Sequence, residues 1–572
     1  MAGPDLRSQE AIARAVDEAA GHYRQGRLDD AEKICTRLLK AVPDLFDALH
    51  LSGLVKLDGG KPAAAQVLLT RALKLNPNSA QVLSNLARTL AALNRDDEAL
   101  ATIDKALALA PDSFDAVNNR GNVLLKLNRA AEAVSAFERV LALEPRFLGA
   151  RGNLGNALAQ LGRFEEALAQ YDALLAAQPS HAETLYSRGN ALASLGRLEE
   201  AIASYDRALA QRPGYGKAHL GRGVAHAALN RHEDALKDYG AVLAADKGNV
   251  DAEHNVALSL LTLGDYRRGF VKYEARWSRT GMPRRRSLGK PLWLGEYPLG
   301  RKTILVHAEQ GLGDTVQFVR YAPLLAKGGA KVVLEVQPEL VSLLSRVDGV
   351  TSVFARGAAL PSYDVHCPAG SLPLALRTDA SSIPAHVPYL AASEARIAKW
   401  RERIERLPSP RIAIAWSGQA THANDRNRSV ALGRLAPLFG AGGGSFVSIQ
   451  HELRAGDAEA LARFPGVTHV GDAIADFDDT AAVMALADLV IAVDTSVVHL
   501  AGALARPVWV LLPFQPDWRW LLDREDSPWY PTARLFRQPE PGDWDSVIAR
   551  VGEALGSGKP ASGLKAVDNK GE

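Results

Sequence analysis

The residues most able to do chemistry form the turn HAEQGLGD, residues 307–314, which lies between the apolar run TILV and the helix-like TVQFVRYAPLLAK. A glycine-rich turn between a strand and a helix commonly holds a phosphate on its backbone amides. Here Asp314 stands at the expected helix start, where its charge would repel a phosphate. The dinucleotide fingerprint G-x-G-x-x-G is also incomplete, because Val316 occupies the place of its third glycine. The turn therefore predicts a different chemistry.

Two interpretations of Asp314 stay open on the sequence. In the structural one, Asp314 is the N-cap of the helix, and Gln317 completes a capping box three residues later. In the functional one, a carboxylate at the mouth of a cleft is a general base that takes a proton from a hydroxyl group.

A second candidate site follows the buried run DLVIAV, where Asp494, Thr495 and Ser496 precede a predicted helix. Amides and hydroxyls at a helix start can bind a diphosphate. The turn WSGQATHANDRNRS follows another predicted strand and supplies Arg426 and Arg428, whose side chains suit phosphate contacts. Either arginine alone could equally be a surface residue, so it is their combination with the Asp-Thr-Ser turn that indicates a phosphate site.

The elements that position these turns are alternating apolar strands and helices, which is typical of parallel sheets covered by helices. The runs form two groups, which predict two Rossmann-like lobes at 301–400 and 401–557 facing a cleft at the carboxyl ends of their strands. An aromatic cluster after the last strand either walls a nucleotide pocket or packs the lobe: Trp518, Trp520, Trp529 and Tyr530. Residues 558–572 are small and polar and are predicted to be disordered.

The first half of the chain repeats every 34 residues, in three registers. One register holds only Gly or Asn, which tolerate the left-handed conformation that ends a helix. A second holds alanine, which lets two helices approach closely, and a third holds proline, which ends a helix. Aromatic residues recur with the same step and are expected to pack between units. The registers begin at Gly26, Ala31 and Pro43, and the aromatic positions are Phe137, Tyr171, Tyr205, Tyr239 and Tyr273.

This pattern resembles tetratricopeptide repeats over residues 10–280, in about eight units, and the resemblance implies an α-solenoid superhelix. Residues 281–300, with three consecutive arginines at 284–286, are interpreted as a solvated linker rather than a nucleic-acid patch. One position in each unit reads Asn85, Asn119, Asn153 and later Asn255. A similar asparagine ladder grips a peptide backbone in eukaryotic O-GlcNAc transferase, so the resemblance implies an acceptor groove. The alternative is that these amides bond neighbouring helices or face water.

The second half resembles family 9 glycosyltransferases of the GT-B fold, the heptosyltransferase group, over roughly 300–550. The resemblance rests on D-T-x-x-x-H-L-A, present as Asp494, Thr495, His499, Leu500 and Ala501, and on the early Gly313-Asp314 turn. It implies that Asp314 is the catalytic base and that eight residues bind the donor: Gly311, Gly313, Arg426, Arg428, Asp494, Thr495, Ser496 and His499. The combination of repeats with such a domain looks like bacterial repeat-plus-glycosyltransferase proteins.

The leading hypothesis is thus an inverting glycosyltransferase that uses a nucleotide-sugar donor, with a protein or peptide in the repeat groove as the candidate acceptor. The alternative is a tetratricopeptide scaffold whose transferase module has lost activity. No cofactor or metal is expected, because no His, Cys and carboxylate cluster has ligand spacing. A net charge of +2, two distant cysteines and the lack of a signal-like N-terminus or an unbroken apolar span predict a cytoplasmic protein without nucleic-acid or membrane partners.

Overall fold

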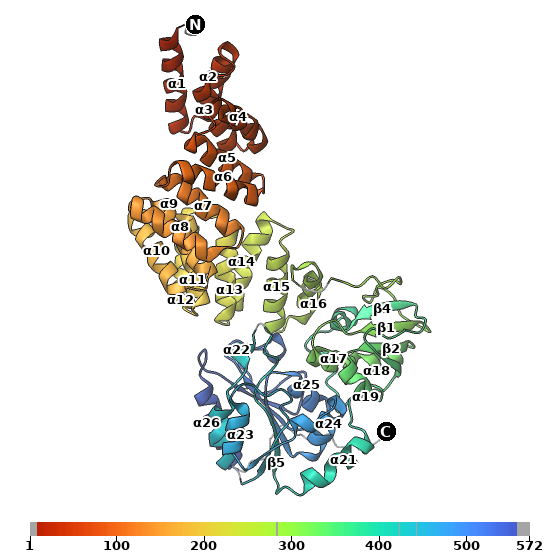
Figure 1. Cartoon of the computed structure of the whole chain (residues 1–572). Helices are drawn as coiled ribbons and strands as arrows, with labels where there is room; N and C mark the ends of the chain where they lie inside the picture. Colours follow the sequence, from red (N-terminus) through yellow and green to blue (C-terminus); the bar gives the residue numbers. More distant parts are fainter. Residues whose placement is uncertain (1–7, 282–283, 423, 442, 558–572) are drawn as a thin grey trace. The chain divides into compact units, whose positions relative to one another are not determined.

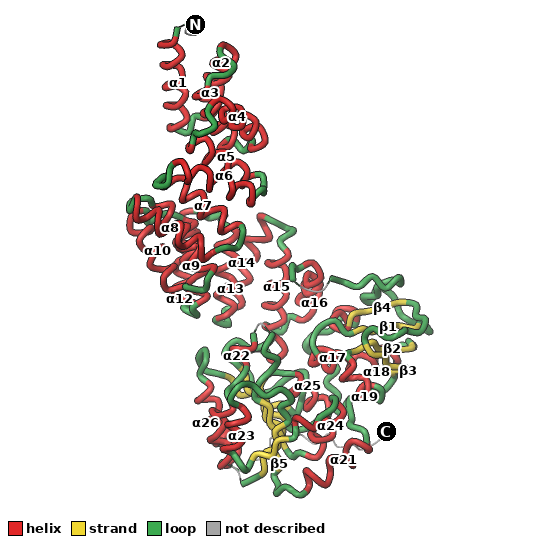
Figure 2. Tube along the Cα trace, in the orientation of Figure 1, coloured by secondary structure: helices red, strands yellow, loops and turns green. Residues whose placement is uncertain are grey.

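The computed structural model describes residues 8–281, 284–422, 424–441 and 443–557, so the predicted disordered tail at 558–572 lies outside the described residues. The chain divides into two compact units, Met1–Ala225 and His226–Glu572. Figure 1 labels the elements, and Figure 2 distinguishes the all-helical first half from the part that carries strands.

Within the described residues, sixteen helices, α1 to α16, alternate along the chain as the A and B helices of eight repeat units. The A helices are α1 Gln9–Arg24, α3 Phe46–Asp58, α5 Ala80–Ala92, α7 Phe114–Lys126, α9 Leu148–Gln160, α11 Ala182–Ser194, α13 Gly216–Ala228 and α15 Val250–Thr262. The B helices are α2 Leu28–Ala41, α4 Pro62–Leu75, α6 Asp96–Leu109, α8 Ala130–Leu143, α10 Phe164–Ala177, α12 Leu198–Gln211, α14 His232–Ala245 and α16 Tyr266–Tyr273.

The three sequence registers have the structural roles expected of them. Every Gly or Asn of the first register, from Gly26 to Gly264, has a positive φ between the A and the B helix of a pair. Every alanine from Ala31 to Ala235 is fully buried, as a close helix approach requires. Each B helix from α2 to α12 ends two residues before its register proline, and the intervening residue is extended or nearly so. The helical repeat array is therefore confirmed.

The packing of the recurring aromatic residues differs from the expectation. They are buried, but Phe137, Tyr171 and Tyr205 lie against a glycine on the A helix of their own pair. An added Cβ on Gly155, for example, would come within 2.5 Å of the Tyr171 ring. Of these three rings, Tyr205 also closely approaches a glycine of the next pair, Gly221. In these three units the aromatic side chain thus packs mainly within its own unit, in the space that the glycine leaves.

The last repeat helices belong to the second compact unit and share a hydrophobic core with its sheets. This core contains Leu261 of α15 and Phe270 of α16 together with residues of strands β1 and β8 (below). Helix α16 has only eight residues and continues as a 3-10 helix, η1 Glu274–Ser278. The end of the array is therefore built into the α/β part of the chain.

The first α/β lobe has a four-stranded parallel sheet in the order β3-β2-β1-β4. Its strands are β1 Thr303–His307, β2 Lys331–Val336, β3 Val350–Ala355 and β4 Val365–Pro368. Its helices are α17 Leu312–Phe318, η2 Val319–Tyr321, α18 Ala322–Lys327, η3 Pro338–Leu340, α19 Val341–Leu344, η4 Ala369–Ser371 and α20 Leu372–Ala375.

The second lobe has a six-stranded parallel sheet in the order β10-β9-β8-β5-β6-β7. Its strands are β5 Arg411–Ala415, β6 Ser445–Ser448, β7 Val467–His469, β8 Leu489–Val493, β9 Val508–Leu512 and β10 Ala533–Arg537. Helix α21 Glu394–Glu405 precedes β5. The others are α22 Asp425–Arg428, η5 Leu432–Gly440, α23 Asp457–Arg463, η6 Gly471–Ala473, α24 Phe477–Leu486, α25 Ser496–Ala503, η7 Trp518–Trp520 and α26 Trp544–Gly556.

The predicted parallel sheets are confirmed, and the turns that follow β1, β5 and β8 lie at the carboxyl ends of their strands. Throughout the described ranges, every helix is too short or too polar to cross a membrane.

Candidate functional site

Asp314 lies in the first turn of α17, and its carboxylate caps that helix from inside. The helix begins at Leu312 with Gly311 as its N-cap residue, and Asp314 Oδ2 accepts a 2.9 Å hydrogen bond from the Gly311 N–H. The expectation that Asp314 is the N-cap and pairs with Gln317 is therefore wrong, because the N-cap is Gly311 and the helix starts three residues earlier. Asp314 supplies the reach-back half of a capping box, and its side chain stays 24% exposed.

The other oxygen of Asp314 is held by Arg519, a residue of η7 in the second lobe. Arg519 Nη2 donates to Asp314 Oδ1, Nη1 donates to Asp517 at 2.9 Å, and Nε donates to Gln317 Oε1. Burial alone would lower the pKa of Arg519, but the charges of Asp517 and Asp314 outweigh burial and hold this pKa above its ordinary value. One buried guanidinium therefore joins the two lobes at the carboxylate.

The two predicted turns also meet directly, through α17 and α25. A Cβ added to Gly313 would lie 2.8 Å from His499 Cδ2 and 3.3 Å from Ser496 Cα. Glycine at 313 is therefore required by close approach rather than by backbone conformation. The turn after β1 and the turn after β8 form a single site.

His499 is a buried, neutral packing residue of this site. Its ring stacks on Trp520 with centroids 5.6 Å apart, and Nδ1 lies 3.0 Å from the Tyr530 hydroxyl. Burial, together with the positive charges of Arg519, Arg320 and Arg428, lowers the pKa of His499 well below its usual value.

Asp494 follows β8 and is 8% exposed. Burial, reinforced by the charge of Asp517, raises the pKa of Asp494 to about 7, although Arg428 and Arg519 oppose the shift. Arg428 Nη1 donates to the Asp494 carbonyl at 3.0 Å. Arg426, on the same one-turn helix α22, is exposed. The structure thus brings Arg428 to the predicted site but leaves Arg426 at the surface.

Four hydrogen-bond donors on the turns near Asp494 are buried without a partner among the described residues. They come from the turn after β5, α22, the start of α25 and α17, and they are Ser417 Oγ, Arg428 Nε, Thr495 Oγ1 and Gln317 Nε2. The indole N–H of Trp520 is not counted with them, because it interacts with the Asp494 carboxyl group. Arg428 is tied to Asp494 through the Asp494 carbonyl, and Gln317 is tied to Arg519. Because buried polar groups are normally hydrogen-bonded, such a group of donors indicates a site for an acceptor-rich ligand. We call these four groups the donor cluster.

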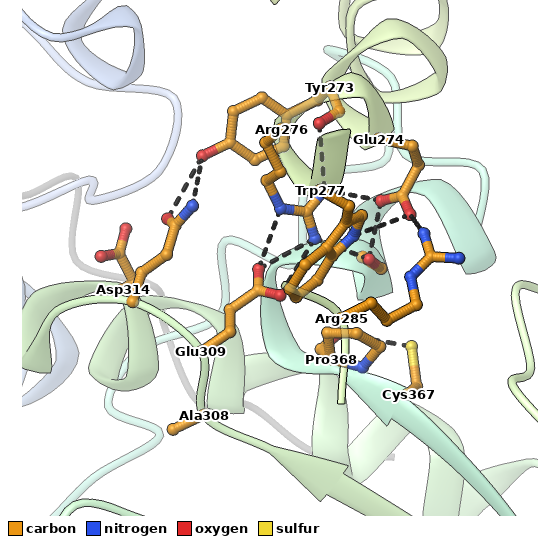
Figure 3. Close-up of polar contacts among 12 residues, drawn as sticks. Tyr273, Glu274, Arg276, Trp277, Arg285, Ala308, Glu309, Asp314, Cys367 and Pro368 are labelled. Atoms are coloured by element: carbon orange, nitrogen blue, oxygen red, sulfur yellow. Dashed lines mark hydrogen bonds and ion pairs between the residues drawn. The ribbon is translucent and has the colours of Figure 1, made fainter. Parts of the chain in front are cut away.

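A buried ionic network anchors the turn that carries Asp314 to the end of the repeats (Figure 3). Arg276 of η1 lies between Glu274 and Glu309, with Nη2 2.9 Å from Glu309 Oε1. The Tyr273 hydroxyl exchanges hydrogen bonds with the Gln310 side chain, at 3.2 and 3.0 Å. Burial raises the pKa of Glu309 to about 7 even though Arg276 opposes the shift. The turn is thus held by the last repeat on one side and by Arg519 on the other.

The aromatic cluster after β9 packs the second unit. Trp518 and Trp529 make edge contacts with Tyr266 of α16, and Trp529 Nε1 donates to the Tyr266 hydroxyl at 3.1 Å. Trp520 and Tyr530 instead surround His499. Of the four, Trp520 also interacts with the Asp494 carboxyl group.

The asparagine register forms inter-helix bonds. Asn85 Nδ2 lies 2.8 Å from His50 Nε2, Asn119 Nδ2 donates to Ser84 Oγ at 3.0 Å, and Asn153 Nδ2 donates to Asn118 Oδ1 at 3.5 Å. Each bond reaches the preceding A helix, as in the alternative interpretation, and each amide remains partly exposed. Asn255 lies in the second unit, on α15, and is also partly exposed.

Sequence reasoning missed Arg519, Gln317, Glu309, Arg276 and His422 as members of the site. His422, exposed before α22, is within electrostatic reach of Arg428 and Asp314. A charged residue flanked by two tryptophans, as in DWRW, was the one signal for Arg519. Across the described part of the chain, no group of three or more His, Cys, Asp or Glu side chains is arranged to hold a metal ion.

The chain is 29% identical over 329 residues to protein FlbA of Caulobacter vibrioides, a match that covers 52% of this chain and 54% of FlbA. The chain thus spans about half the length of this curated relative. Among solved structures, a tetratricopeptide repeat protein from Parabacteroides merdae is 18% identical with a TM-score of 0.36 and covers 44% of this chain and 98% of its own. YrrB, described as a TPR protein with an unusual peptide-binding site, is 27% identical with a TM-score of 0.28 and covers 32% and 96%.

Family models described as tetratricopeptide repeat match residues 56–119, 118–182, 153–216 and 186–250. Together with the eight helix pairs, these matches identify residues 56–250 as tetratricopeptide repeats.

Proposed function

We propose that this chain is an inverting glycosyltransferase with a GT-B arrangement of its two lobes. In this proposal it moves a sugar from a nucleoside diphosphate donor to a hydroxyl group of a protein segment held by the repeats. The observation that carries the proposal is the donor cluster. All four of its unpartnered groups can donate hydrogen bonds, and a diphosphate offers many acceptor oxygens and no competing donors when ionised.

The charges around the cluster support an anionic ligand. Arg428 contributes a guanidinium with a free Nε–H, and the start of α25 at Ser496 adds backbone amides and the positive end of a helix dipole. Asp494 would oppose a diphosphate if it were ionised, but its raised pKa lets it take up a proton near neutral pH. Protonation of the Asp494 carboxyl group would therefore make the site around the donor cluster more favourable to a diphosphate.

The proposed reaction is one displacement. Asp314 accepts the proton of the acceptor hydroxyl while that oxygen forms a bond to the anomeric carbon. The bond from this carbon to the diphosphate oxygen breaks, and its electron pair leaves with the nucleoside diphosphate. Arg428 and the start of α25 would stabilise the charge that grows on the leaving group. Attack opposite the leaving group inverts the anomeric configuration.

The partly exposed asparagine amides of the array support a peptide as acceptor. In each of the three bonded asparagines, the bond to the preceding helix uses the amide nitrogen, which orients the side chain. A primary amide has two N–H donors and a carbonyl acceptor, so each side chain keeps capacity to bond the backbone of an extended segment. The same asparagine side chains could therefore bond the preceding helix and bind a peptide at the same time.

The test is turnover of a panel of nucleotide sugars with uridine, guanosine, adenosine and thymidine bases, with release of nucleoside diphosphate as the readout. The double variant D314N/R428M, which lacks the proposed base and a proposed phosphate ligand, is the inactive control. We expect release with at least one donor by the native chain and an inverted anomeric centre in the product. If the native chain neither releases nor binds any nucleoside diphosphate, the result would favour the alternative, a non-catalytic repeat scaffold.

A further inference from the structure

We propose that Arg519 is a positioning residue that fixes the orientation of the Asp314 carboxylate for proton transfer, an inference that rests on the proposed function. Arg519 lies in η7, after strand β9 of the second lobe. Its side chain contacts two residues of α17 in the first lobe. No motif assigns it a role.

The geometry at Asp314 leaves room for one further hydrogen-bonded group. Oδ2 accepts from the Gly311 N–H and Oδ1 accepts from Arg519, so each oxygen is held once. An ionised carboxylate has about four lone-pair sites, and two therefore remain for an acceptor hydroxyl. Because the two anchors come from opposite lobes, they fix the plane of the carboxylate rather than only its distance.

Each guanidinium nitrogen of Arg519 already donates to a protein group. Its Nε, Nη1 and Nη2 atoms donate to Gln317, Asp517 and Asp314, and the residue is 6% exposed. It could not turn toward a donor phosphate without breaking these bonds. Arg428, by contrast, keeps a buried Nε–H without a partner. The two arginines are therefore suited to different tasks, and Arg519 is suited to hold Asp314.

The chain next to Arg519 is held in an unusual backbone conformation. Leu521 has φ 54° and ψ −164°, a region that side-chain-bearing residues rarely adopt. Arg537 of β10 donates to the carbonyls of Trp520, Leu521 and Arg524 and fixes this segment. The Arg519 guanidinium also lies 4.4 Å from the centre of the Trp518 ring. These contacts define where the guanidinium can be.

The charge that faces Asp314 is mixed, and Arg519 is the cation in direct contact with it. The other titratable groups within electrostatic reach of Asp314 or paired with Arg519 are Tyr273, Glu309, His422 and Asp517. Without Arg519, Asp314 would face two acidic side chains, Glu309 and Asp517, with no cation in contact. Loss of Arg519 should therefore leave the Asp314 carboxylate without the contact that fixes its orientation from the second lobe.

The test compares R519M, which removes the charge, with R519K, which keeps it but lacks the planar fork. R534Q is the matched control, because Arg534 is a second-lobe arginine whose ion pair with Glu525 is exposed. In R519M, kcat for nucleotide-sugar turnover should fall about 10- to 100-fold through misplacement of the Asp314 carboxylate, while the KM for the donor stays near its native value. R519K should recover part of this loss, because its ammonium group can still pair with Asp314. R534Q should match the native chain.

A second readout needs no turnover. The difference in Tm between the native chain and D314N at neutral pH should shrink in the R519M background, because the two side chains form one ion pair. If the native chain turns over no donor but this coupling is present, the proposed function fails and the contact stands. The inference is overturned if R519M keeps the native kcat and the native coupling, or if its main defect is loss of uridine, guanosine or adenosine diphosphate binding.

Discussion

The repeat array and the candidate site use small residues for opposite reasons. In the array, glycine and asparagine at 34-residue intervals adopt positive φ, and each does its work within a single turn. At the site, Gly313 is needed because α25 approaches it from a different lobe. The first requirement is local and repeats along the sequence, whereas the second depends on a contact between residues about 190 positions apart. Small residues at regular intervals therefore mark the turns of the repeats, whereas an isolated glycine such as Gly313 marks a contact between two lobes.

The same contrast holds for charged residues. Arginine and glutamate pairs of the repeats, such as Arg95 with Glu98 and Arg197 with Glu200, are exposed neighbours on one helix. Such exposed pairs contribute little to stability, because water screens their charges. Arg519 and Arg276 are buried and join segments far apart in the sequence. Removing one partner of a buried pair is expected to cost much more than removing a surface pair.

The largest expected effect is that of D314N on sugar transfer. Loss of a general base costs about 10²- to 10⁴-fold in rate. Binding of nucleoside diphosphate should be retained, because the donor cluster does not include Asp314. Transfer kinetics and calorimetric binding on one preparation measure both quantities. Full transfer by D314N would reduce Asp314 to a helix-capping residue.

The next effect concerns the array. The triple variant N85A/N119A/N153A should reduce transfer to a peptide acceptor by roughly one to three orders of magnitude, at about 0.5–1.5 kcal/mol for each lost contact. Donor hydrolysis should be unchanged, because the three amides lie in the first compact unit and the donor cluster in the second. Equal loss of both activities would point to unfolding, and the circular dichroism spectrum would reveal it.

Glycine substitutions sharpen the comparison between the two regions. G313A should destabilise the second unit by about 1–3 kcal/mol, because the added methyl group would meet His499 and the Ser496 backbone. G21A in α1 has open space around it and should stabilise the first unit by about 0.5–1 kcal/mol. Scanning calorimetry of both variants checks the opposite signs. Stability changes of the same sign in G313A and G21A would contradict the difference between the two regions.

The smallest expected effect is a pH dependence of ligand binding. Asp494 has a pKa raised to about 7, so it is neutral below this pH and anionic above it. A diphosphate beside it should therefore bind more tightly as the pH falls through 7, by at most about tenfold per pH unit. Asp517, Arg428 and Arg519 face the same carboxyl group, and their charges set the midpoint. Calorimetry in buffers of different ionisation enthalpy should detect proton uptake on binding.

Sequence alone was sufficient for the architecture and only partly sufficient for the site. The repeat registers, the parallel strands and the turns after β1 and β8 could be predicted because each follows from local patterns. Arg519, Gln317 and Arg276 could not, because nothing near them in sequence shows which partner they meet. The helix start at Leu312 was missed because Asp314 suits an N-cap position as well as the first helical turn.

The most direct test of the central claim is calorimetric titration of the native chain, R428M and R426M with uridine, guanosine and adenosine diphosphates. Arg428 carries an unpartnered N–H in the donor cluster, whereas Arg426 is an exposed arginine two residues away. We expect at least one diphosphate to bind, R428M to weaken it by about 1.5–3 kcal/mol, and R426M to leave it nearly unchanged. Equal affinities in all three chains, or no binding to the native chain, would contradict a diphosphate site at the donor cluster.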